Sequence, residues 1–409
     1  MKILDVSPKV ALPPNTGSRV RMYNLLRHLS RDHEVWQFSQ QRATSLLREH
    51  VNEVQATPGY CEIQYAHPAV SLVGNLAEAR HVAAPTLRGA GLWLARPARL
   101  RSLLEWADVV LVEFPWQFAY CSRNRGSAPL LLASHNVEAE RFASVAQAEG
   151  GPGARHRWAG WIERVERRAV LGSDLVLAVS PEDRAEFIRR YRVDPSRIVV
   201  VPNGADTGRY APVDAAAKAE ARRKLGLPAR PTVLYTGSDT APNRAGLRWV
   251  RRLAERAQHL SFVVVGELSR GLVDEPFFAP GVVNDVTPFL DAADIAICPI
   301  EFGGGTKIKL LESMAAGLPT VAFAETIQGL DVRDGEHLRV VTKSEDALLA
   351  ALDELNASPD LCQRLGETAR RYVCDHHEWR QMASLLEDVL IESTRDKRDL
   401  TSTGLVRTF

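Results

Sequence analysis

The sequence lacks the features that mark membrane, nucleic-acid-binding and disulfide-rich proteins. It has no apolar run long enough to span a bilayer, and residues 1–8 give way at once to polar and proline residues, so we expect no leader segment. A formal net charge of only +1 argues against nucleic acid as a partner. Five scattered cysteines without C-x-x-C spacing indicate neither a disulfide framework nor a zinc site. We therefore expect a cytoplasmic protein.

Two ligand-binding motifs are also missing. No G-x-G-x-x-G occurs, so the fingerprint of a dinucleotide-binding protein is absent. No D-x-D pair occurs that would hold a divalent cation. Residues 374–377, CDHH, contain metal-binding residue types, but adjacent histidines on one element point in different directions and no second ligand group is visible. We expect neither a metal nor a cofactor.

The length and the order of elements indicate two α/β domains. The 409 residues exceed the usual size of one hydrophobic core, and 45% hydrophobic with 25% charged residues is typical of globular proteins. Short apolar strands, such as Lys2–Val6 and Asp108–Val112, alternate with helical segments through both halves. One helix is expected near Arg42–Val51 and another over Leu361–Ile391. This alternation is typical of doubly wound parallel sheets.

The segment Ala293–Phe323 predicts a strand, a glycine turn, a helix and a second strand in one unit. The apolar run Ile295–Ile300 suits a buried parallel strand, and Gly303–Gly305 then allow the chain to turn. Lys307–Ala316 has helical spacing of its apolar residues, and Thr320–Phe323 is the next strand. We predict a ligand site where the turn meets the helix.

A glycine turn that opens a helix favours an anion. Its unpaired backbone N–H groups and the positive end of the helix dipole attract a group such as a diphosphate. Lys307 and Lys309 add positive charge at an end where cations are unfavourable to the dipole, which indicates that something negative binds there. Glu312 is near enough to hydrogen-bond the hydroxyls of an attached sugar. The alternative is a plain glycine turn with a solvated lysine face and a surface glutamate.

The segment Gly303–Glu312, GGGTKIKLLE, resembles the donor-binding segment of family four retaining glycosyltransferases of the GT-B fold, in their bacterial polysaccharide branch. The segments Pro202–Asp206, PNGAD, and His135–Glu138, HNVE, support the resemblance, which covers nearly the whole chain. It implies an α/β protein with two Rossmann-like, doubly wound parallel-sheet domains that face a cleft. The expected acceptor domain is 1–206 and the donor domain is 207–380. Residues 381–409 would be a helix that braces the N-terminal domain, followed by a tail.

The resemblance also implies which residues bind the donor. Glu312 matches the second glutamate of the family's pair and is expected to contact the ribose, whereas Gly304 stands where the family has its first glutamate. The missing carboxylate's role would pass to backbone N–H groups of Gly304–Thr306 or to the two lysines. The expected donor-binding residues are Gly17, Gly237, Ser238, Asn243, Gly266, Val286, Gly304, Gly305, Thr306, Lys307, Lys309, Leu311 and Glu312.

The acceptor side is expected around His135. This histidine follows the predicted strand Leu130–Ala133, where a side chain can line a crevice and titrate near neutrality. By resemblance, His135 would contact or polarise the acceptor, with Glu138 and Trp116 as further acceptor-side residues. A capping or core histidine is the alternative. The expected catalytic residues are His135, Lys309 and Glu312.

Two stretches, 72–106 and 155–168, combine arginine with leucine and tryptophan. This composition suits a surface at the membrane interface, and we expect peripheral contact with the inner membrane face. The alternative is a pair of amphipathic helices with an apolar core face and a solvated charged face.

We predict a metal-independent, retaining glycosyltransferase. It would move a sugar from a UDP- or GDP-sugar to a hydroxyl of a polysaccharide, a glycolipid or a small molecule, with the nucleotide sugar as substrate. Two alternatives stay open. One is a nucleotide-sugar epimerase on the same scaffold, and the other is a catalytically inactive donor-binding or scaffold protein, which the glycine at 304 makes credible.

Overall fold

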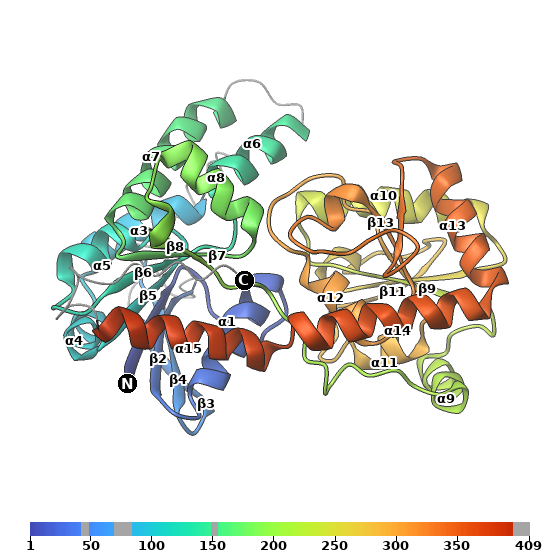
Figure 1. Ribbon diagram of the computed structural model, residues 1–409, viewed down its shortest axis with the longest axis horizontal. Coiled ribbons are helices and arrows are strands. Elements are labelled where there is room, and N and C mark those ends of the chain that lie inside the picture. The colour runs from blue at the N-terminus through green and yellow to red at the C-terminus, as the bar shows by residue number, and fades with distance from the viewer. Residues whose placement is uncertain (42–48, 69–83, 149–153, 396–409) are drawn as a thin grey trace. The chain divides into compact units, whose positions relative to one another are not determined.

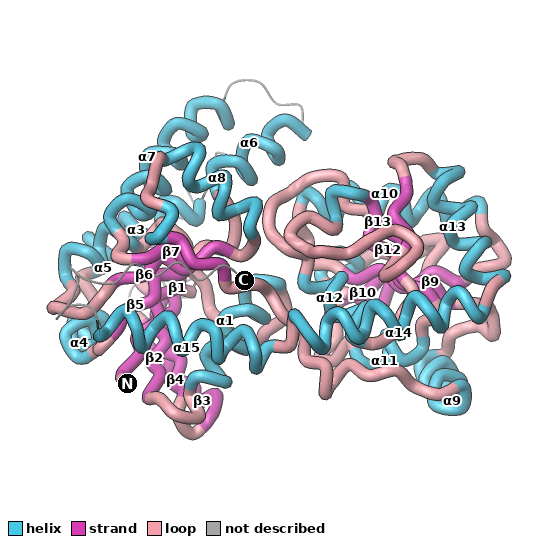
Figure 2. The backbone as a smooth tube through the Cα atoms, viewed as in Figure 1, coloured by secondary structure: helices cyan, strands magenta, loops and turns pink. Residues whose placement is uncertain are grey.

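The computed structural model describes residues 1–41, 49–68, 84–148 and 154–395, which form two compact units (Figure 1). Of the described residues, the first unit contains those within 1–14, 18–202 and 382–395, and the second contains residues 15–17 and 203–381. In each unit the strands gather into one sheet with helices around it (Figure 2).

The sheet of the first unit has the strand order β3-β4-β2-β1-β5-β6-β7-β8. All neighbouring strands are parallel except the pair of β3 and β4 at one edge. The order of successive strands reverses between β1 and β5, which makes their carboxyl ends the position where ligands of open α/β sheets bind. The elements are β1 Lys2–Ser7, α1 Gly17–Leu29, β2 Glu34–Gln40, β3 His50–Thr57, β4 Tyr60–Ala66, α3 Ala84–Ala95, α4 Ala98–Trp106, β5 Val109–Glu113, α5 Phe118–Asn124, β6 Leu130–Ala133, α6 Glu138–Ala148, α7 Ala154–Gly172, β7 Leu175–Ala178, α8 Pro181–Tyr191 and β8 Ile198–Val200.

The sheet of the second unit is parallel throughout and has the order β11-β10-β9-β12-β13-β14. Here the strand order reverses between β9 and β12. The elements are α9 Ala215–Leu225, β9 Thr232–Thr236, α10 Ala241–Arg256, β10 Ser261–Val265, β11 Phe278–Gly281, α11 Thr287–Ala292, β12 Ile295–Cys298, α12 Ile308–Ala315, β13 Thr320–Phe323, β14 Arg339–Val341, α13 Glu345–Ala357, α14 Pro359–His376 and α15 Trp379–Arg395.

Local signals set several helix ends. Ser180 caps α8 by accepting a hydrogen bond from the Asp183 N–H at 3.1 Å, and Pro181 occupies the first helical position. Asp214 caps α9 in the same way, and Gly226 ends that helix with φ +67°. Each of these helix ends is therefore set by residues next to it in the chain.

Two predicted helices are wrong in part. Of the helix expected near Arg42–Val51, residues 42–48 lie outside the described residues, whereas residues 50 and 51 begin the strand β3. β3 pairs antiparallel with β4 across the short turn at Pro58 and Gly59, a hairpin signal that the helical prediction missed.

The long helix expected over Leu361–Ile391 is two helices, α14 and α15, with a break at residues 377–378. The chain leaves the helix there because Ala205 pairs with it as a short parallel bridge. The Ala205 N–H donates to the His377 carbonyl at 2.7 Å, and the Trp379 N–H donates to the Ala205 carbonyl at 3.2 Å. From residue 382 onward, α15 belongs to the first unit, where Glu387 hydrogen-bonds His33 at 2.8 Å.

Candidate functional site

The loop between β12 and α12 forms the centre of the candidate site in the second unit. It leaves the sheet beside β9, where the strand order reverses, so it lies at the edge expected to bind a ligand. Gly303 and Gly305 have φ of +107° and +72°, a conformation that residues with a side chain rarely adopt. The predicted glycine turn is confirmed as a strand-to-helix connection.

Two further glycines bring strand ends into close contact at the same edge. Gly266, after β10, has φ +117°, and a Cβ atom there would lie 2.3 Å from the carbonyl oxygen of Gly237, after β9. The Gly237 N–H in turn donates to the Val265 carbonyl at 2.9 Å. Any side chain at residue 266 would separate the backbones of Gly237 and Gly266. Both glycines are among the residues that the sequence predicts to bind the donor.

Lys309 is fixed in the first turn of α12. Its Nζ donates to the Thr236 carbonyl at 3.0 Å and to Asn243 Oδ1 at 2.7 Å, and it lies 4.4 Å from the centre of the Tyr235 ring. Asn243 Nδ2 donates to the Ser238 carbonyl at 2.8 Å, so the loop after β9 is held through the same amide. Burial lowers the pKa of Lys309, while Cys298 and Glu312 act in the opposite direction. A cation is thus held by neutral partners at the ligand edge.

Lys307 takes a different position from the one expected. Its Nζ donates to the carbonyls of Gly303, Gly304 and Gly305 at 2.9, 2.9 and 2.6 Å. The ammonium group therefore stabilises the glycine loop by neutralising three carbonyl dipoles. Of the two lysines, Lys309 is the one that ties α12 to the end of a neighbouring strand.

Glu312 lies one helical turn beyond Lys309. Burial raises the pKa of Glu312 to about 7, against the opposing effects of Arg209, a hydrogen bond with Tyr210, and Lys309. Arg209 is itself held by Asp285, with Nη2 and Oδ1 2.6 Å apart. A carboxylate with such a pKa and a nearby cation is a suitable acceptor for a sugar hydroxyl.

The other predicted donor residues fall into different environments. Thr306 is buried, and its Oγ1 has no hydrogen-bond partner among the described residues, while its carbonyl accepts from Asn203 Nδ2 at 3.1 Å. Val286 caps α11, where its carbonyl accepts from the N–H groups of residues 289 and 290. Leu311 packs in the core and its N–H bonds the Lys307 carbonyl, so it offers nothing to a ligand. Gly17 is the first residue of α1, and it groups with the second unit.

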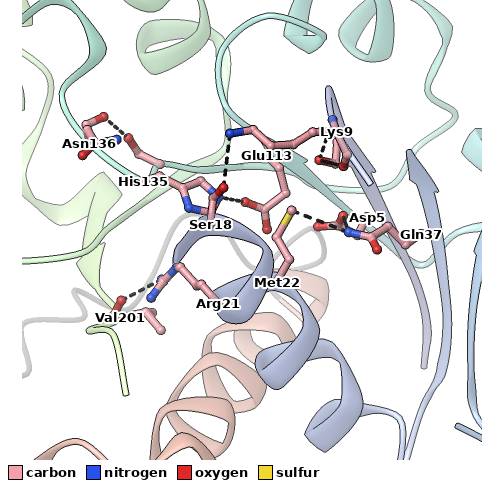
Figure 3. A network of polar contacts seen from close by, with 12 residues as sticks. Asp5, Lys9, Ser18, Arg21, Met22, Gln37, Glu113, His135, Asn136 and Val201 are labelled. Atoms are coloured by element: carbon pink, nitrogen blue, oxygen red, sulfur yellow. Dashed lines mark hydrogen bonds and ion pairs between the residues drawn. The ribbon is translucent and has the colours of Figure 1, made fainter. Parts of the chain in front are cut away.

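In the first unit, the ligand edge carries a buried pair formed by Glu113 and His135 (Figure 3). Glu113 ends β5, His135 follows β6, and the two strands are neighbours. Glu113 Oε2 forms a very short hydrogen bond with His135 Nε2. The His135 ring also stacks on Phe114, with ring centres 4.2 Å apart and planes at 9°. The predicted histidine thus lies at the carboxyl edge with its orientation fixed.

Three charged residues surround this pair. Lys9 Nζ lies 4.6 Å from the centre of the Phe114 ring and 3.2 Å from Ser18 Oγ. Arg21 donates to the Val201 and Pro202 carbonyls at 2.7 and 2.8 Å. Asp5 of β1 accepts from Gln37 Nε2 at 2.8 Å. Burial raises the pKa of Glu113 to about 7, with Arg21, Asp5 and Lys9 acting against it.

The two other acceptor-side predictions have structural partners. The Glu138 carboxylate accepts from Asn136 Nδ2 at 3.2 Å and from Arg141 Nε at 3.1 Å. The N–H groups of residues 138 and 139 donate to Glu166, which thereby caps α6. Trp116 is only 5% exposed and packs with Phe142 and the aromatic residues of α7. Its ring offers no surface to an acceptor.

Sequence reasoning missed Glu113 and Asp5. The available signal was a carboxylate at the end or within an apolar strand, VVLVE and KILDVS, where an unpaired charge is costly. It also missed Glu62 of β4, whose carboxylate accepts from the Ala11 N–H at 2.6 Å and from Ser39 Oγ at 2.7 Å. Glu62 thereby holds the loop that follows β1.

A cavity of about 600 Å³ lies in the second unit at the opposite edge of the sheet, where β9, β12 and β13 begin. Two of its cations, Lys218 and Arg222, both bond the Asp294 carboxylate. Both cations are already engaged by this carboxylate, so we assign no ligand to this cavity.

The arginine and tryptophan stretches are only partly described, because residues 72–83 lie outside the described residues. In the described part, Trp93 and Leu94 of α3 are 42% and 65% exposed. Trp158 and Trp161 instead pack against the aromatic cluster around Trp116. Among the described helices, none has the length and apolarity that crossing a bilayer requires. The described residues also hold no cluster of side chains suited to a metal ion.

Two family models match the chain. Residues 15–209 match Glycosyltransferase Family 4, and residues 230–358 match Glycosyl transferases group 1. A GDP-mannose-dependent alpha-(1-6)-phosphatidylinositol monomannoside mannosyltransferase of Mycobacterium tuberculosis is 30% identical over 369 residues, which cover 78% of this chain and 91% of that protein. A D-inositol 3-phosphate glycosyltransferase of Salinispora arenicola is 28% identical over 66% of this chain. That match covers 65% of the Salinispora protein, and the first curated relatives are matched over 64–65% of their length.

Solved structures share the fold. A sucrose-phosphate synthase from Thermosynechococcus elongatus superposes with a TM-score of 0.74 at 17% identity, over 96% of this chain and 99% of that one. Anabaena HepE in complex with UDP and glucose superposes with a TM-score of 0.69 at 14% identity, over 96% and 99% of the two chains.

Proposed function

Because the chain belongs to glycosyltransferase family 4 and has the GT-B fold, we propose that it transfers a sugar from a nucleoside diphosphate sugar to an acceptor hydroxyl, with retention of configuration. The predictions of family and of an α/β fold with two Rossmann-like sheets are confirmed. In this proposal the second unit binds the donor and the first unit binds the acceptor.

The observation that carries the proposal is the fixed position of Lys309 beside Glu312 at the ligand edge of the second sheet. When the bond between the sugar and the diphosphate breaks, negative charge grows on the leaving phosphate oxygen. An ammonium held in place by Thr236 and Asn243 needs no reorganisation to stabilise that charge. Glu312, held by Tyr210, would accept a hydrogen bond from a hydroxyl of the donor ribose.

The reaction we propose is attack on the same face of the sugar from which the diphosphate leaves. The acceptor oxygen bonds to the anomeric carbon as the bond to the phosphate oxygen breaks, and that phosphate oxygen takes the acceptor proton. His135 would contact the acceptor hydroxyl. We propose that no metal ion is required, because Lys309 and the loop N–H groups supply the positive potential.

The relatives suggest substrate classes. The Mycobacterium relative is named for GDP-mannose and a phosphatidylinositol mannoside, and the Anabaena structure contains UDP and glucose. We propose a UDP- or GDP-sugar as donor and a sugar or lipid-linked hydroxyl as acceptor. For a lipid-linked acceptor, the exposed Trp93 and Leu94 would contact the membrane surface at its cytoplasmic face.

An epimerase and an inactive scaffold are not favoured, because the relatives cited above carry the names of transferases. An epimerase would convert the donor without an acceptor. A scaffold protein would release no nucleoside diphosphate from any donor.

Calorimetric binding of a panel of UDP- and GDP-sugars, without metal, tests the proposal. We expect one donor to bind the wild type, and both Lys309→Ala and Glu312→Ala to weaken that binding by about 10- to 100-fold, as for loss of a hydrogen bond to a charged group. Lys224→Ala is the matched control, because Lys224 lies on α9, its side chain is 70% exposed, and it pairs with Glu220 of the same helix. If no nucleotide sugar binds, or if the control weakens binding as much, the donor-site assignment is wrong.

A further inference from the structure

A row of buried polar residues crosses the first sheet to its ligand edge. Glu62 of β4, Gln37 of β2 and Asp5 of β1 are register partners on neighbouring strands. Gln37 donates to Asp5 Oδ1 at 2.8 Å and accepts from Tyr60 Oη at 2.5 Å, so its amide orientation is fixed. The row continues from Asp5 to Glu113, at the point where the strand order reverses (Figure 3).

Asp5 and Glu113 are both buried carboxylic acids, and Asp5 Oδ2 receives no hydrogen bond from any described residue. Two ionised carboxylates would repel, so one of them carries a proton. Burial and the charge of Glu113 raise the pKa of Asp5 well above its ordinary value, whereas a hydrogen bond from Asp5 lowers that of Glu113. With the proton on Oδ2, the oxygen that no described residue engages, Asp5 is the donor and Glu113 the acceptor.

Glu113 in turn fixes the orientation of the His135 ring. Its carboxylate engages Nε2, while Phe114 covers a face of the ring. No described residue bonds Nδ1 of His135. A carboxylate that already accepts from Asp5 favours the imidazole form with hydrogen on Nε2, which leaves a lone pair on Nδ1.

We propose that Glu113 is a positioning residue, held by protonated Asp5, that keeps the proton of His135 on Nε2 and so presents the Nδ1 lone pair to the acceptor hydroxyl. The inference deepens the proposed transfer reaction and rests on it. In the bound acceptor, that lone pair accepts a hydrogen bond from the hydroxyl and so holds the acceptor oxygen in place. As the oxygen bonds to the anomeric carbon, the hydroxyl hydrogen turns from Nδ1 to the phosphate oxygen that leaves, and His135 neither gains nor loses a proton.

The charges around the pair set its pH dependence. Lys9 and Arg21 favour ionised Glu113 and disfavour protonation of His135, whereas Glu138 favours that protonation. Burial keeps the pKa of His135 well below its ordinary value. When Glu113 gains a proton, near its pKa of about 7, its O–H donates to Nε2 and the imidazole hydrogen moves to Nδ1. The productive form is lost as pH falls through that value.

The first test is the tautomer of His135, measured by nitrogen NMR on the full chain labelled in histidine, with His135→Gln to assign the signal. We expect hydrogen on Nε2 at pH 8 in the wild type. Glu113→Leu should lose this preference, and Glu113→Gln, whose amide oxygen can still accept from Nε2, should keep part of it. Hydrogen on Nδ1 in the wild type, or an unchanged tautomer in Glu113→Leu, would overturn the proposal.

Asp5 offers a second pair of variants. Asp5→Asn supplies an N–H donor in place of the protonated carboxyl and should retain the wild-type tautomer, whereas Asp5→Leu should not. Equal behaviour of the two variants would contradict the role of Asp5. The melting temperature of the first unit shows whether each variant is folded, and Asp5→Asn keeps the question testable if the leucine variants unfold.

The kinetic test separates this inference from the proposed function. Donor hydrolysis, in which water is the acceptor, needs no identified substrate. We expect Glu113→Leu to lower kcat on the order of 10²-fold, as for a misplaced reacting group, while donor affinity stays unchanged, and Glu113→Gln to lose the fall in rate near pH 7. If the wild type binds and hydrolyses a donor but Glu113→Leu has the same kcat and pH profile, only this inference fails. If the wild type binds no donor, the proposed function fails.

Discussion

Replacement of Gly266 by alanine should damage the second unit more than any ordinary glycine substitution. Its backbone, at φ +117° and ψ −169°, is in a region that essentially only glycine occupies, which costs about 1–3 kcal/mol for another residue. The new Cβ would lie 2.3 Å from the Gly237 carbonyl oxygen, and such backbone overlap adds about 1–3 kcal/mol. Gly271→Ala is the matched control, because Gly271 has φ +72° with nothing within 4 Å of a Cβ, so that only about 1–2 kcal/mol of backbone strain remains.

Thermal unfolding of the two variants measures the difference. A domain of this size loses about 2–4 °C of Tm for each kcal/mol, so Gly266→Ala should unfold roughly 5–10 °C below Gly271→Ala. Donor binding should fall with it, since the ends of β9 and β10 must separate to admit the methyl group. Equal melting temperatures would refute the reasoning. They would show that a Cβ atom at residue 266 can be accommodated despite the 2.3 Å distance to the Gly237 carbonyl oxygen.

Three further predictions concern buried carboxylates. The Glu62 carboxylate accepts hydrogen bonds from the N–H groups of Ala11 and Leu12 and from the Ser39 hydroxyl, and Glu62→Gln would place an amide N–H against one of these donors. The substitution should lower the free energy of unfolding of the first unit by about 2–3 kcal/mol. Chemical denaturation measures this change, with the exposed Glu105→Gln as control. Burial raises the pKa of Glu166 to about 7, so folding stability is lost as pH rises from the unfolded value near 4.5 through 7. Glu166→Gln should remove this pH dependence, which amounts to up to about 1.4 kcal/mol of unfolding free energy per pH unit. A plot of Tm against pH that is the same in the variant and the wild type would contradict the prediction. Tyr210→Phe removes a hydrogen bond that lowers the pKa of Glu312, so the pKa of Glu312 should rise above about 7. In calorimetry, the pH at which half of the donor binding is lost should rise with it. An unchanged pH would show that ionised Glu312 is not needed to bind the donor.

The donor segment shows how far local sequence information reaches. Its strand, glycine turn, helix and second strand are formed by residues next to each other in the chain, so the elements were predicted almost to the residue. The partners of its lysines were not predictable, because they depend on packing between elements. Lys309 meets Thr236 and Asn243, which are more than sixty residues away, and Lys307 folds back on the loop that it was expected to serve.

The hairpin of β3 and β4 shows the opposite failure. Pro58 and Gly59 form a turn signal in the sequence, whereas the helical pattern over Arg42–Val51 predicted a helix where β3 begins. The break between α14 and α15 had no local signal, since it arises from pairing with Ala205, far away in the chain. Errors of the first kind can be corrected from the sequence, and those of the second kind require the fold.

The sequence by itself determined the α/β class, the alternation of strands and helices, the glycine loop and the family, because each depends on neighbouring residues or on a contiguous motif. Only the tertiary structure decided which strands are neighbours. That order brings Asp5, Glu113 and His135 together from positions 5, 113 and 135 of the chain. Burial then changes the chemistry of these groups, because a carboxyl or imidazole removed from water takes the charge state that its few fixed partners allow.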